Sequence, residues 1–251
     1  MSSGLKARLK NGERLLGTMI TIADPTVAEI LADVGFDWLF IDGEHGPLGT
    51  QEVLAILQAV GAKVPCIVRV PECAEAPIKQ MLDIGAAGII VPQVNSAEQA
   101  ADVVRYAKYA PEGSRGVGLA RAHGYGARFA EYLQAANSEI LVVVQAEHAE
   151  AVQNIDEIVK VEGVDAILLG PYDLSASLGK MGEVSDPVVT QAIDKITDAC
   201  KANEMPLGYF GVNAEAIRPY QEQGYTLLVA GVDTLILSGG ATRLLKDMRG
   251  K

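Results

Sequence analysis

The sequence predicts an α/β fold, a (β/α)8 barrel of the TIM type, and three observations carry that prediction. Short apolar, β-branched runs alternate with segments of helical period along the chain. Most of these runs are nearly continuous, as in strands that are covered on both faces. Eight such units in 251 residues match the usual size of this barrel, whereas a doubly wound sheet has fewer strands and a glycine-rich first turn. The turn at 21–24 has no glycine.

Each expected element has its own local signal. The eight apolar runs predict strands at 15–20, 38–41, 64–70, 88–91, 140–144, 166–169, 207–210 and 227–230. Helix starts are predicted where an acceptor side chain precedes a proline or forms a capping box, at Asp24, Asp186 and Ser96. Gly35 and Gly224 are placed to end helices in the left-handed conformation. These signals repeat the same strand–helix rhythm.

The connection between the fourth and fifth strands is longer than the others. It contains a predicted helix at 96–108, a loop rich in glycine and arginine at 111–128, and a second helix at 129–136. Long loops in compact domains tend to be functional. No linker or low-complexity segment divides the chain, so we expect one barrel domain over 1–251.

Composition excludes several classes of protein. With 49% hydrophobic and 21% charged residues the chain can bury a full core, which excludes disorder. A net charge of −11 disfavours nucleic acid and anionic lipid as partners. The charged N-terminus and the lack of a long apolar run predict a cytoplasmic protein with no membrane contact. Cys66, Cys73 and Cys200 lack metal-site spacing and are expected to be reduced packing residues.

Two carboxylates at predicted strand ends suggest a metal site. Side chains at the C-terminal ends of barrel strands face the catalytic mouth. Gln145 and Glu147 are two residues apart and share one face of a strand, while Asp173 follows the next strand. Glu147 and Asp173 can therefore present oxygens to Mg²⁺, Mn²⁺ or Co²⁺. The alternative is that either acid caps a helix.

Basic groups at the mouth point to anionic chemistry. Arg69 ends an apolar strand and needs an anionic partner, which a carboxylate or a developing enolate would supply. An ion pair with Asp42 is the structural alternative. His45 follows the second strand and is a natural proton carrier near neutral pH. No lysine lies on an inner strand face, which disfavours a Schiff-base mechanism.

These residues resemble those of the metal-dependent class II pyruvate aldolases. That family includes 4-hydroxy-2-oxoheptanedioate aldolase and 2-keto-3-deoxy sugar acid aldolases, within the phosphoenolpyruvate/pyruvate barrel superfamily. The similarity runs over almost the whole chain, in order. The matching stretches are 35–45, 67–69, 78–85, 89–92, 113–118, 120–122, 144–147, 161–165, 170–175 and 231–233.

The resemblance implies a role for each matching residue near the metal. Glu147 and Asp173 ligate the divalent cation, and pyruvate chelates it through its carboxylate and keto oxygens. Gln145 supports these ligands. The backbone amides of Asp173, Leu174 and Ser175 receive the pyruvate carboxylate at a helix N-terminus.

The resemblance also implies which residues take part in the reaction. Arg69 binds the keto oxygen and stabilises the enolate. His45, with Asp42 beside it, orients a water or carries the proton, and Asp83 reaches the site from a neighbouring subunit. Arg121 is expected to contact substrate.

The expected function is a carbon–carbon lyase that reversibly cleaves 4-hydroxy-2-oxoacids into pyruvate, or a related 2-oxoacid such as hydroxypyruvate, and an aldehyde. Lyases acting on citryl- or malyl-CoA esters and a non-catalytic carboxylate-binding barrel are the alternatives. Tyr172, Ala146 and His148 depart from the family pattern and leave the aldehyde open.

A last helix is predicted whose N-cap is Asp233 and whose first turn begins at Thr234. Three consecutive apolar residues at 235–237 turn apolar surface to more than one side of it. The alternatives are a wide apolar face on its own barrel or an early break at Gly239 and Gly240. The resemblance implies that this helix is exchanged between subunits in a hexamer built from two trimers.

Overall fold

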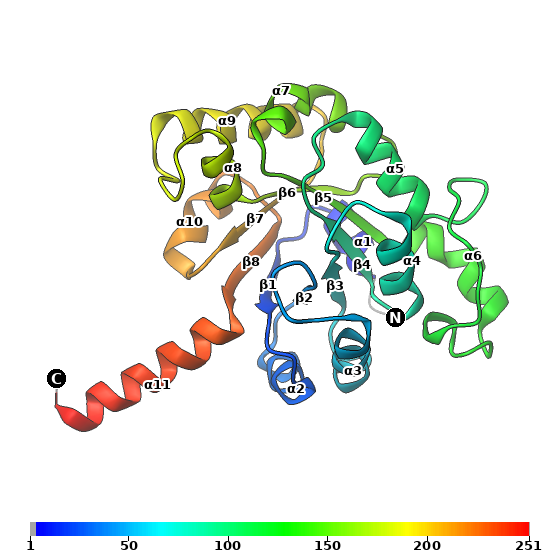
Figure 1. Ribbon diagram of the computed structural model, residues 1–251, viewed down its shortest axis with the longest axis horizontal. Coiled ribbons are helices and arrows are strands. Elements are labelled where there is room, and N and C mark those ends of the chain that lie inside the picture. Colours follow the sequence, from blue (N-terminus) through cyan, green and yellow to red (C-terminus); the bar gives the residue numbers. More distant parts are fainter. Residues whose placement is uncertain (1–3, 251) are drawn as a thin grey trace.

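The computed structural model describes residues 4–250, and these form a closed barrel of eight parallel strands surrounded by helices (Figure 1). The strands are β1 (Leu15–Ile20), β2 (Trp38–Asp42), β3 (Cys66–Arg69), β4 (Gly88–Val91), β5 (Leu141–Ala146), β6 (Ala166–Leu169), β7 (Leu207–Gly211) and β8 (Leu227–Val232). The first helices are α1 (Leu5–Lys10), α2 (Pro25–Val34), α3 (Thr50–Val60), α4 (Glu75–Asp83) and α5 (Ala97–Ala107). The others are η1 (Arg121–His123), α6 (Phe129–Glu139), α7 (Ala149–Ile158), α8 (Pro171–Ser177), α9 (Pro187–Ala202), α10 (Ala214–Glu222) and α11 (Asp233–Arg249).

The strand order confirms the predicted barrel. Each strand pairs in parallel with the next one in sequence, and β8 closes onto β1. Three strands begin and end where the apolar runs do, and the other five differ by one or two residues at one or both ends. Two of those differences matter, because Asp42 closes β2 and Gln145 lies within β5. Both polar side chains are therefore held by strand backbone at the C-terminal ends.

Large side chains fill the barrel interior. Trp38 and Phe40 point inward from β2 and are fully buried, with ring centroids 6.0 Å apart. A Cβ on Gly17 would lie 2.6 Å from the Trp38 ring, so the neighbouring strand needs glycine there. Leu5 and Leu9 of α1 join this interior cluster and close the N-terminal end of the barrel. The interior of the barrel is therefore a packed core.

The outer helices begin where their capping signals predict. Asp24 accepts a hydrogen bond from the amide of Thr26 at 2.8 Å, and Ser96 accepts from the amide of Gln99 at 3.2 Å. Asp186 caps α9 in the same way. Gly35 ends α2 with a left-handed φ of 105°. The apolar faces of these helices pack on the outer side of the strands and form the larger core cluster.

The last helix leaves the barrel. Figure 1 shows α11, in red, extending away from the strands, and every residue from 234 to 250 is exposed. The helix passes through Gly239 and Gly240 without a break. Both the early break and the packing on its own barrel are therefore wrong. Across residues 4–250, no helix has the length and apolar character to cross a membrane.

Candidate active site

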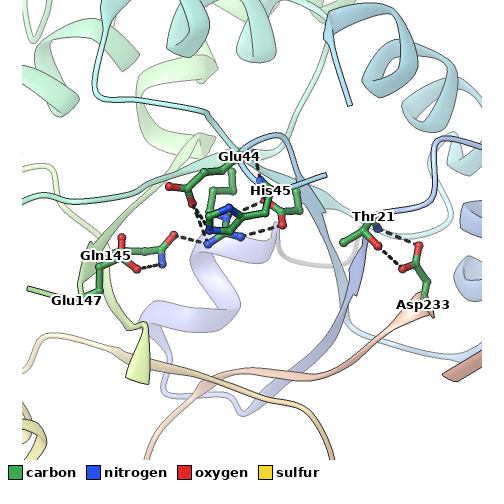
Figure 2. Close-up of polar contacts among 8 residues, drawn as sticks. Thr21, Glu44, His45, Gln145, Glu147 and Asp233 are labelled. Atoms are coloured by element: carbon green, nitrogen blue, oxygen red, sulfur yellow. Dashed lines mark hydrogen bonds and ion pairs between the residues drawn. The ribbon is translucent and has the colours of Figure 1, made fainter. Parts of the chain in front are cut away.

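A cavity opens at the C-terminal ends of the barrel strands. Its volume is about 270 Å³, and its wall includes Asp42, His45, Arg69, Gln145 and Asp173. These are five of the residues that the sequence assigned to a site. Figure 2 shows Gln145 and Glu147 on one side of the mouth with Glu44 and His45 beside them. The structure thus brings most of the predicted site together.

The centre of the site is a buried arginine bound by acids. Arg69 donates from Nε to Asp42 Oδ1 at 2.9 Å and from Nη2 to Asp42 Oδ2 at 2.8 Å. Its third nitrogen, Nη1, lies 3.0 Å from Glu44 Oε2 and 3.4 Å from Gln145 Oε1. The guanidinium also lies over the Phe40 ring, 5.3 Å from its centroid. The ion pair with Asp42, which the sequence analysis gave as the structural alternative, is present, and Arg69 still faces the cavity.

Burial and charge act in opposite directions on these acids. Burial favours a raised pKa for Asp42, but the hydrogen bonds and charge of Arg69, with the amides of Glu44 and His45, hold its pKa below the ordinary value. For Glu44, burial raises the pKa and outweighs the attraction of Arg69 and His45. Asp42 is therefore the firmly ionised acid, and Glu44 is the acid that protonates more easily.

His45 is placed as an accessible ring at the rim. Its side chain is 66% exposed, and its Nε2 lies 3.7 Å from Glu44 Oε2. Asp42 contacts the backbone amide of His45 at 3.3 Å, not the imidazole. The acid beside the ring is therefore Glu44, which the sequence analysis left out of the site. Its position next to His45 in the chain was the signal that could have included it.

Glu147 is held in a closely fitted cradle. Its Oε2 accepts from Gln145 Nε2 at 2.6 Å, and its Oε1 accepts from the amide of Gln93 at 2.9 Å. Gln93 has a φ of 53°, in the left-handed region that few non-glycine residues occupy. A Cβ on Gly170 would lie 2.3 Å from Glu147 Oε2. Sequence reasoning found Gln145 and missed Gln93, a polar residue just after β4.

The Glu147 carboxyl has an unusual electrostatic environment. Burial raises its pKa to about 7, the Gln93 amide opposes this, and the negative charges of Asp173 and Glu44 add to it. Asp173 itself is exposed and lies in the first turn of α8, whose N-cap is Gly170. Asp173 is therefore not a helix cap, which removes the structural alternative for that residue.

The donor set fits a divalent cation with an open coordination sphere. Hard cations such as Mg²⁺ take carboxylate oxygens and commonly use one or two of them, with waters and substrate completing the sphere. Each Glu147 oxygen accepts one hydrogen bond and keeps a lone pair. Among residues 4–250 no group of three or more His, Cys, Asp or Glu side chains is arranged to hold a metal. Glu147 and Asp173, whose charges interact, remain the candidate pair of carboxylate ligands.

The backbone at the start of α8 differs from the arrangement expected for binding the carboxylate of a substrate. The Leu174 amide donates to the Gly170 carbonyl at 3.0 Å, as the first hydrogen bond of the helix. The Ser175 hydroxyl donates to the Tyr172 carbonyl at 2.6 Å and accepts from the Gly182 amide at 2.9 Å. Leu174 and Ser175 are buried and already bonded. The N–H groups that precede the first helical bond belong to Tyr172 and Asp173.

Asp83 and Arg121 lie at the opposite end of the barrel. Asp83 is the last residue of α4, and its Oδ1 accepts from Arg115 Nη2 at 2.6 Å. Arg121 donates to the carbonyls of Ile84 and Leu57, each at 2.9 Å. The expected contact of Arg121 with substrate is therefore absent within its own subunit, because its guanidinium caps the ends of two helices. Asp83 does not reach its own cavity either.

A larger cavity lies at this opposite end, with a volume of about 620 Å³. It is lined by Arg8, Lys63 and Arg121 among others. Arg8 is paired with Glu13 and Asp37, and Lys63 with Asp33. Size alone would favour this larger cavity as the active site. Its Arg and Lys side chains are bound to other protein groups, however, and the clustered carboxylates lie at the other end of the barrel.

One further contact ties the mouth to the last helix. Asp233, the first residue of α11, is buried and accepts from the Thr21 hydroxyl at 2.7 Å and from the Thr21 and Ile22 amides at 2.9 and 2.8 Å. Figure 2 shows this pair apart from the acids around Arg69. Thr21 lines the cavity, so these hydrogen bonds connect the start of α11 directly to the wall of the site.

Comparison with known proteins gives a consistent match. The family model described as HpcH/HpaI aldolase/citrate lyase matches residues 16–238. The chain is 38% identical to 4-hydroxy-2-oxovalerate aldolase of Novosphingobium aromaticivorans, over 98% of this chain and 95% of that protein. It is 40% identical to 4-hydroxy-2-oxo-heptane-1,7-dioate aldolase of Escherichia coli, over 97% and 94%. The crystal structure of an HpcH/HpaI aldolase/citrate lyase family protein from Burkholderia cenocepacia J2315 superposes with a TM-score of 0.94 at 35% identity, covering 98% of each chain.

Proposed function

The chain belongs to the HpcH/HpaI aldolase/citrate lyase family, and we propose that its barrel mouth is the active site of its aldolase reaction. The enzyme is a carbon–carbon lyase that reversibly cleaves 4-hydroxy-2-oxoacids into pyruvate, or a related 2-oxoacid, and an aldehyde. The observation that carries the site assignment is Arg69, whose buried guanidinium faces the cavity beside Glu147 and Asp173.

The reaction needs a positive group where negative charge develops. Cleavage breaks the bond between C3 and C4, and its electron pair forms the enolate of the 2-oxoacid, with charge on the keto oxygen. Arg69 is oriented by Asp42 before substrate arrives, so its Nη1 can donate to that oxygen in place of its contact with Glu44. A fixed donor of this kind is worth more in a water-poor site than in bulk water.

Proton transfer falls to the accessible residues of the rim. The C4 hydroxyl loses a proton as the bond breaks, and the enolate carbon later gains one. His45 is exposed at the cavity and has Glu44 beside it, so in this proposal it holds or passes that proton directly or through a water. Asp42 acts indirectly, because it orients Arg69 and the backbone of 44–45.

Glu147 and Asp173 hold the divalent cation in this proposal. When bound, the cation supplies Lewis-acid polarisation of the 2-oxoacid oxygens. Gln145 donates to one oxygen of Glu147 and accepts from Arg69. It therefore holds the metal ligand Glu147 and the enolate donor Arg69 in a fixed relative position. We assign the substrate carboxylate to the N–H groups at the start of α8, because the positive end of a helix dipole favours an anion.

Assembly is part of the proposal. α11 exposes Leu235, Ile236, Leu237, Leu244 and Leu245, each at least 47% accessible, and touches its own barrel only near its first turn. Such a surface is normally covered. We propose that other copies of the chain cover the apolar surface of α11, in a homo-oligomer of six subunits that exchange this helix. Asp83 then serves the site of a neighbouring subunit.

Cleavage of 4-hydroxy-2-oxovalerate, followed by coupled reduction of released pyruvate, tests the function. The enzyme should release pyruvate, lose this activity in EDTA, and regain it with Mg²⁺ or Mn²⁺. A lyase specific for CoA esters would leave this substrate intact but cleave citryl- or malyl-CoA. A carboxylate-binding barrel without catalysis would cleave neither substrate with any metal.

A further inference from the structure

The wall of the cavity is divided by charge. Every charged lining side chain comes from β2, from β3, from the turn after β2, or from Asp173 at the start of α8. The consecutive strands β6, β7, β8 and β1 contribute uncharged side chains to the wall. These are Met19, Leu168, Leu169, Phe210 and Val232, with Thr21 just after β1 and Tyr172 at the rim. The wall that β6, β7, β8 and β1 form is therefore apolar up to the rim, where Asp173 follows β6, and we call it the apolar half. The charged side chains of β2, β3 and the turn after β2 make up the other part, together with Phe40 of β2.

The uncharged half has no cation to receive a second anionic group. Arg69 is the one Arg or Lys among the lining side chains of the described chain. Its guanidinium is already bound by Asp42 and Glu44. The Thr21 hydroxyl donates to Asp233, and the Asp233 carboxylate adds negative charge behind that wall. Within one subunit, a ligand carboxylate placed on this half would be buried without a partner.

The electrostatic field around the mouth is negative as well. Asp42, Glu44, Glu147 and Asp173 surround the mouth, and the chain as a whole carries a net charge of −11. An anionic substituent on the apolar half would lose water contacts and gain no counter-ion, which is a large cost. A neutral alkyl or hydroxyalkyl substituent would meet apolar side chains and two hydroxyl groups instead.

We propose that the apolar half of this cavity is the subsite for the aldehyde, and that it selects short, uncharged aldehydes over those that carry a carboxylate. This inference rests on the proposed aldolase function of the same site. Related enzymes do not decide the question. Cleavage between C3 and C4 yields acetaldehyde from 4-hydroxy-2-oxovalerate and succinic semialdehyde from 4-hydroxy-2-oxo-heptane-1,7-dioate, and the chain is about equally similar to aldolases named for both.

The test compares two aldehydes of equal carbon number that differ in charge. Butanal and succinic semialdehyde are each added to full-length enzyme with saturating pyruvate and Mg²⁺, with the free aldehyde concentration measured by NMR. The expected kcat/KM is at least roughly 10-fold higher for butanal, because only the semialdehyde leaves a buried carboxylate unpaired. Equal or better use of succinic semialdehyde would overturn the inference.

A variant pair links the preference to the wall. Phe210 is half-buried at the cavity, so Phe210→Arg places a cation on the apolar half, and Phe210→Leu is the matched neutral change. Phe210→Arg should raise the ratio of semialdehyde to butanal turnover about 10-fold over Phe210→Leu. Equal ratios in both variants would contradict the assignment of this wall.

Deuterium exchange into the pyruvate methyl group, measured without aldehyde, is the reference for each protein. Exchange in the wild-type enzyme together with a preference for succinic semialdehyde overturns the subsite inference alone. Absence of exchange with any divalent metal overturns the proposed function, and the inference that rests on it falls as well.

Discussion

Arg69 and Asp42 are direct neighbours in the register of β3 and β2, and they form a two-point ion pair where both strands end. This geometry uses Nε and Nη2 of the guanidinium and leaves Nη1 turned toward Glu44 and Gln145. The pair is buried, with Arg69 6% and Asp42 1% exposed. An arginine held in this way is both a structural partner and a fixed donor to the cavity.

The first prediction separates these two roles. Arg69→Lys keeps the charge but loses the planar fork, so it should lower kcat by about 10²- to 10³-fold with little change in unfolding. Arg69→Ala should show the same kinetic loss and also lower the free energy of unfolding by about 3 kcal/mol, because Asp42 is left buried and unpaired. Steady-state kinetics and urea unfolding measure both. Near-normal turnover in Arg69→Lys would reduce Arg69 to a structural residue.

The second prediction concerns the metal ligands. Glu147→Gln and Asp173→Asn each replace an anionic oxygen with a neutral amide, so each should weaken Mn²⁺ binding by about 10-fold or more in isothermal titration. Glu98→Gln, an exposed change in the first turn of α5, is the matched control and should bind as the wild type does. Unchanged binding in both ligand variants would move the metal to Asp42 and Glu44.

The third prediction follows from the lowered pKa of Asp42. Burial opposes ionisation of this carboxyl, but Arg69 outweighs it, so the folded pKa lies below the unfolded value. The unfolded chain then binds more protons in the acid range, and this contribution to stability is present above about pH 4 and lost as pH falls through the folded pKa. Asp42→Asn does not titrate. The difference in unfolding free energy between the two proteins should therefore shrink from pH 6 to pH 3, and a constant difference would contradict the assignment.

The fourth prediction concerns α11. Leu237 and Leu244 are seven residues apart on one face of the helix and are 65% and 62% exposed. Leu237→Glu with Leu244→Glu should leave the barrel folded but reduce the particle size in light scattering, with loss of activity. Arg243→Glu, on the same helix, is the control for a change of charge. A wild-type protein that is a fully active monomer at micromolar concentration would defeat the proposed assembly.

The barrel was predictable because its strands are continuous apolar runs, and those runs fix where each strand lies. Spacing alone also placed Gln145 and Glu147 on one strand face, and their side chains do bond. The sequence could not show that Arg69 both pairs with Asp42 and faces the cavity. Sequence presented these as alternatives, and packing allows both because the guanidinium has three nitrogens.

Loop positions account for the failures. Arg121 belongs to a long connection whose path depends on packing against α3 and α4, so no local pattern could show that it bonds their last carbonyls. At the start of α8, Leu174 was expected among the amides that receive a carboxylate, but the helix begins at Pro171 and the Leu174 amide already donates to the Gly170 carbonyl. The roles of individual site residues, the single domain over 1–251, the cytoplasmic location and the hexamer stay predictions.

In the proposed reaction, the enolate of a 2-oxoacid forms at the barrel mouth, with Arg69 as the hydrogen-bond donor to its oxygen. Proton NMR of pyruvate in D₂O tests it most directly, because exchange of the methyl protons requires the enolate and no aldehyde. We expect exchange with Mg²⁺ or Mn²⁺ in the wild-type enzyme, loss of exchange in EDTA, and exchange slowed by about 10²- to 10³-fold in Arg69→Lys. Exchange that persists in EDTA, or that is as fast in Arg69→Lys as in the wild type, would contradict it.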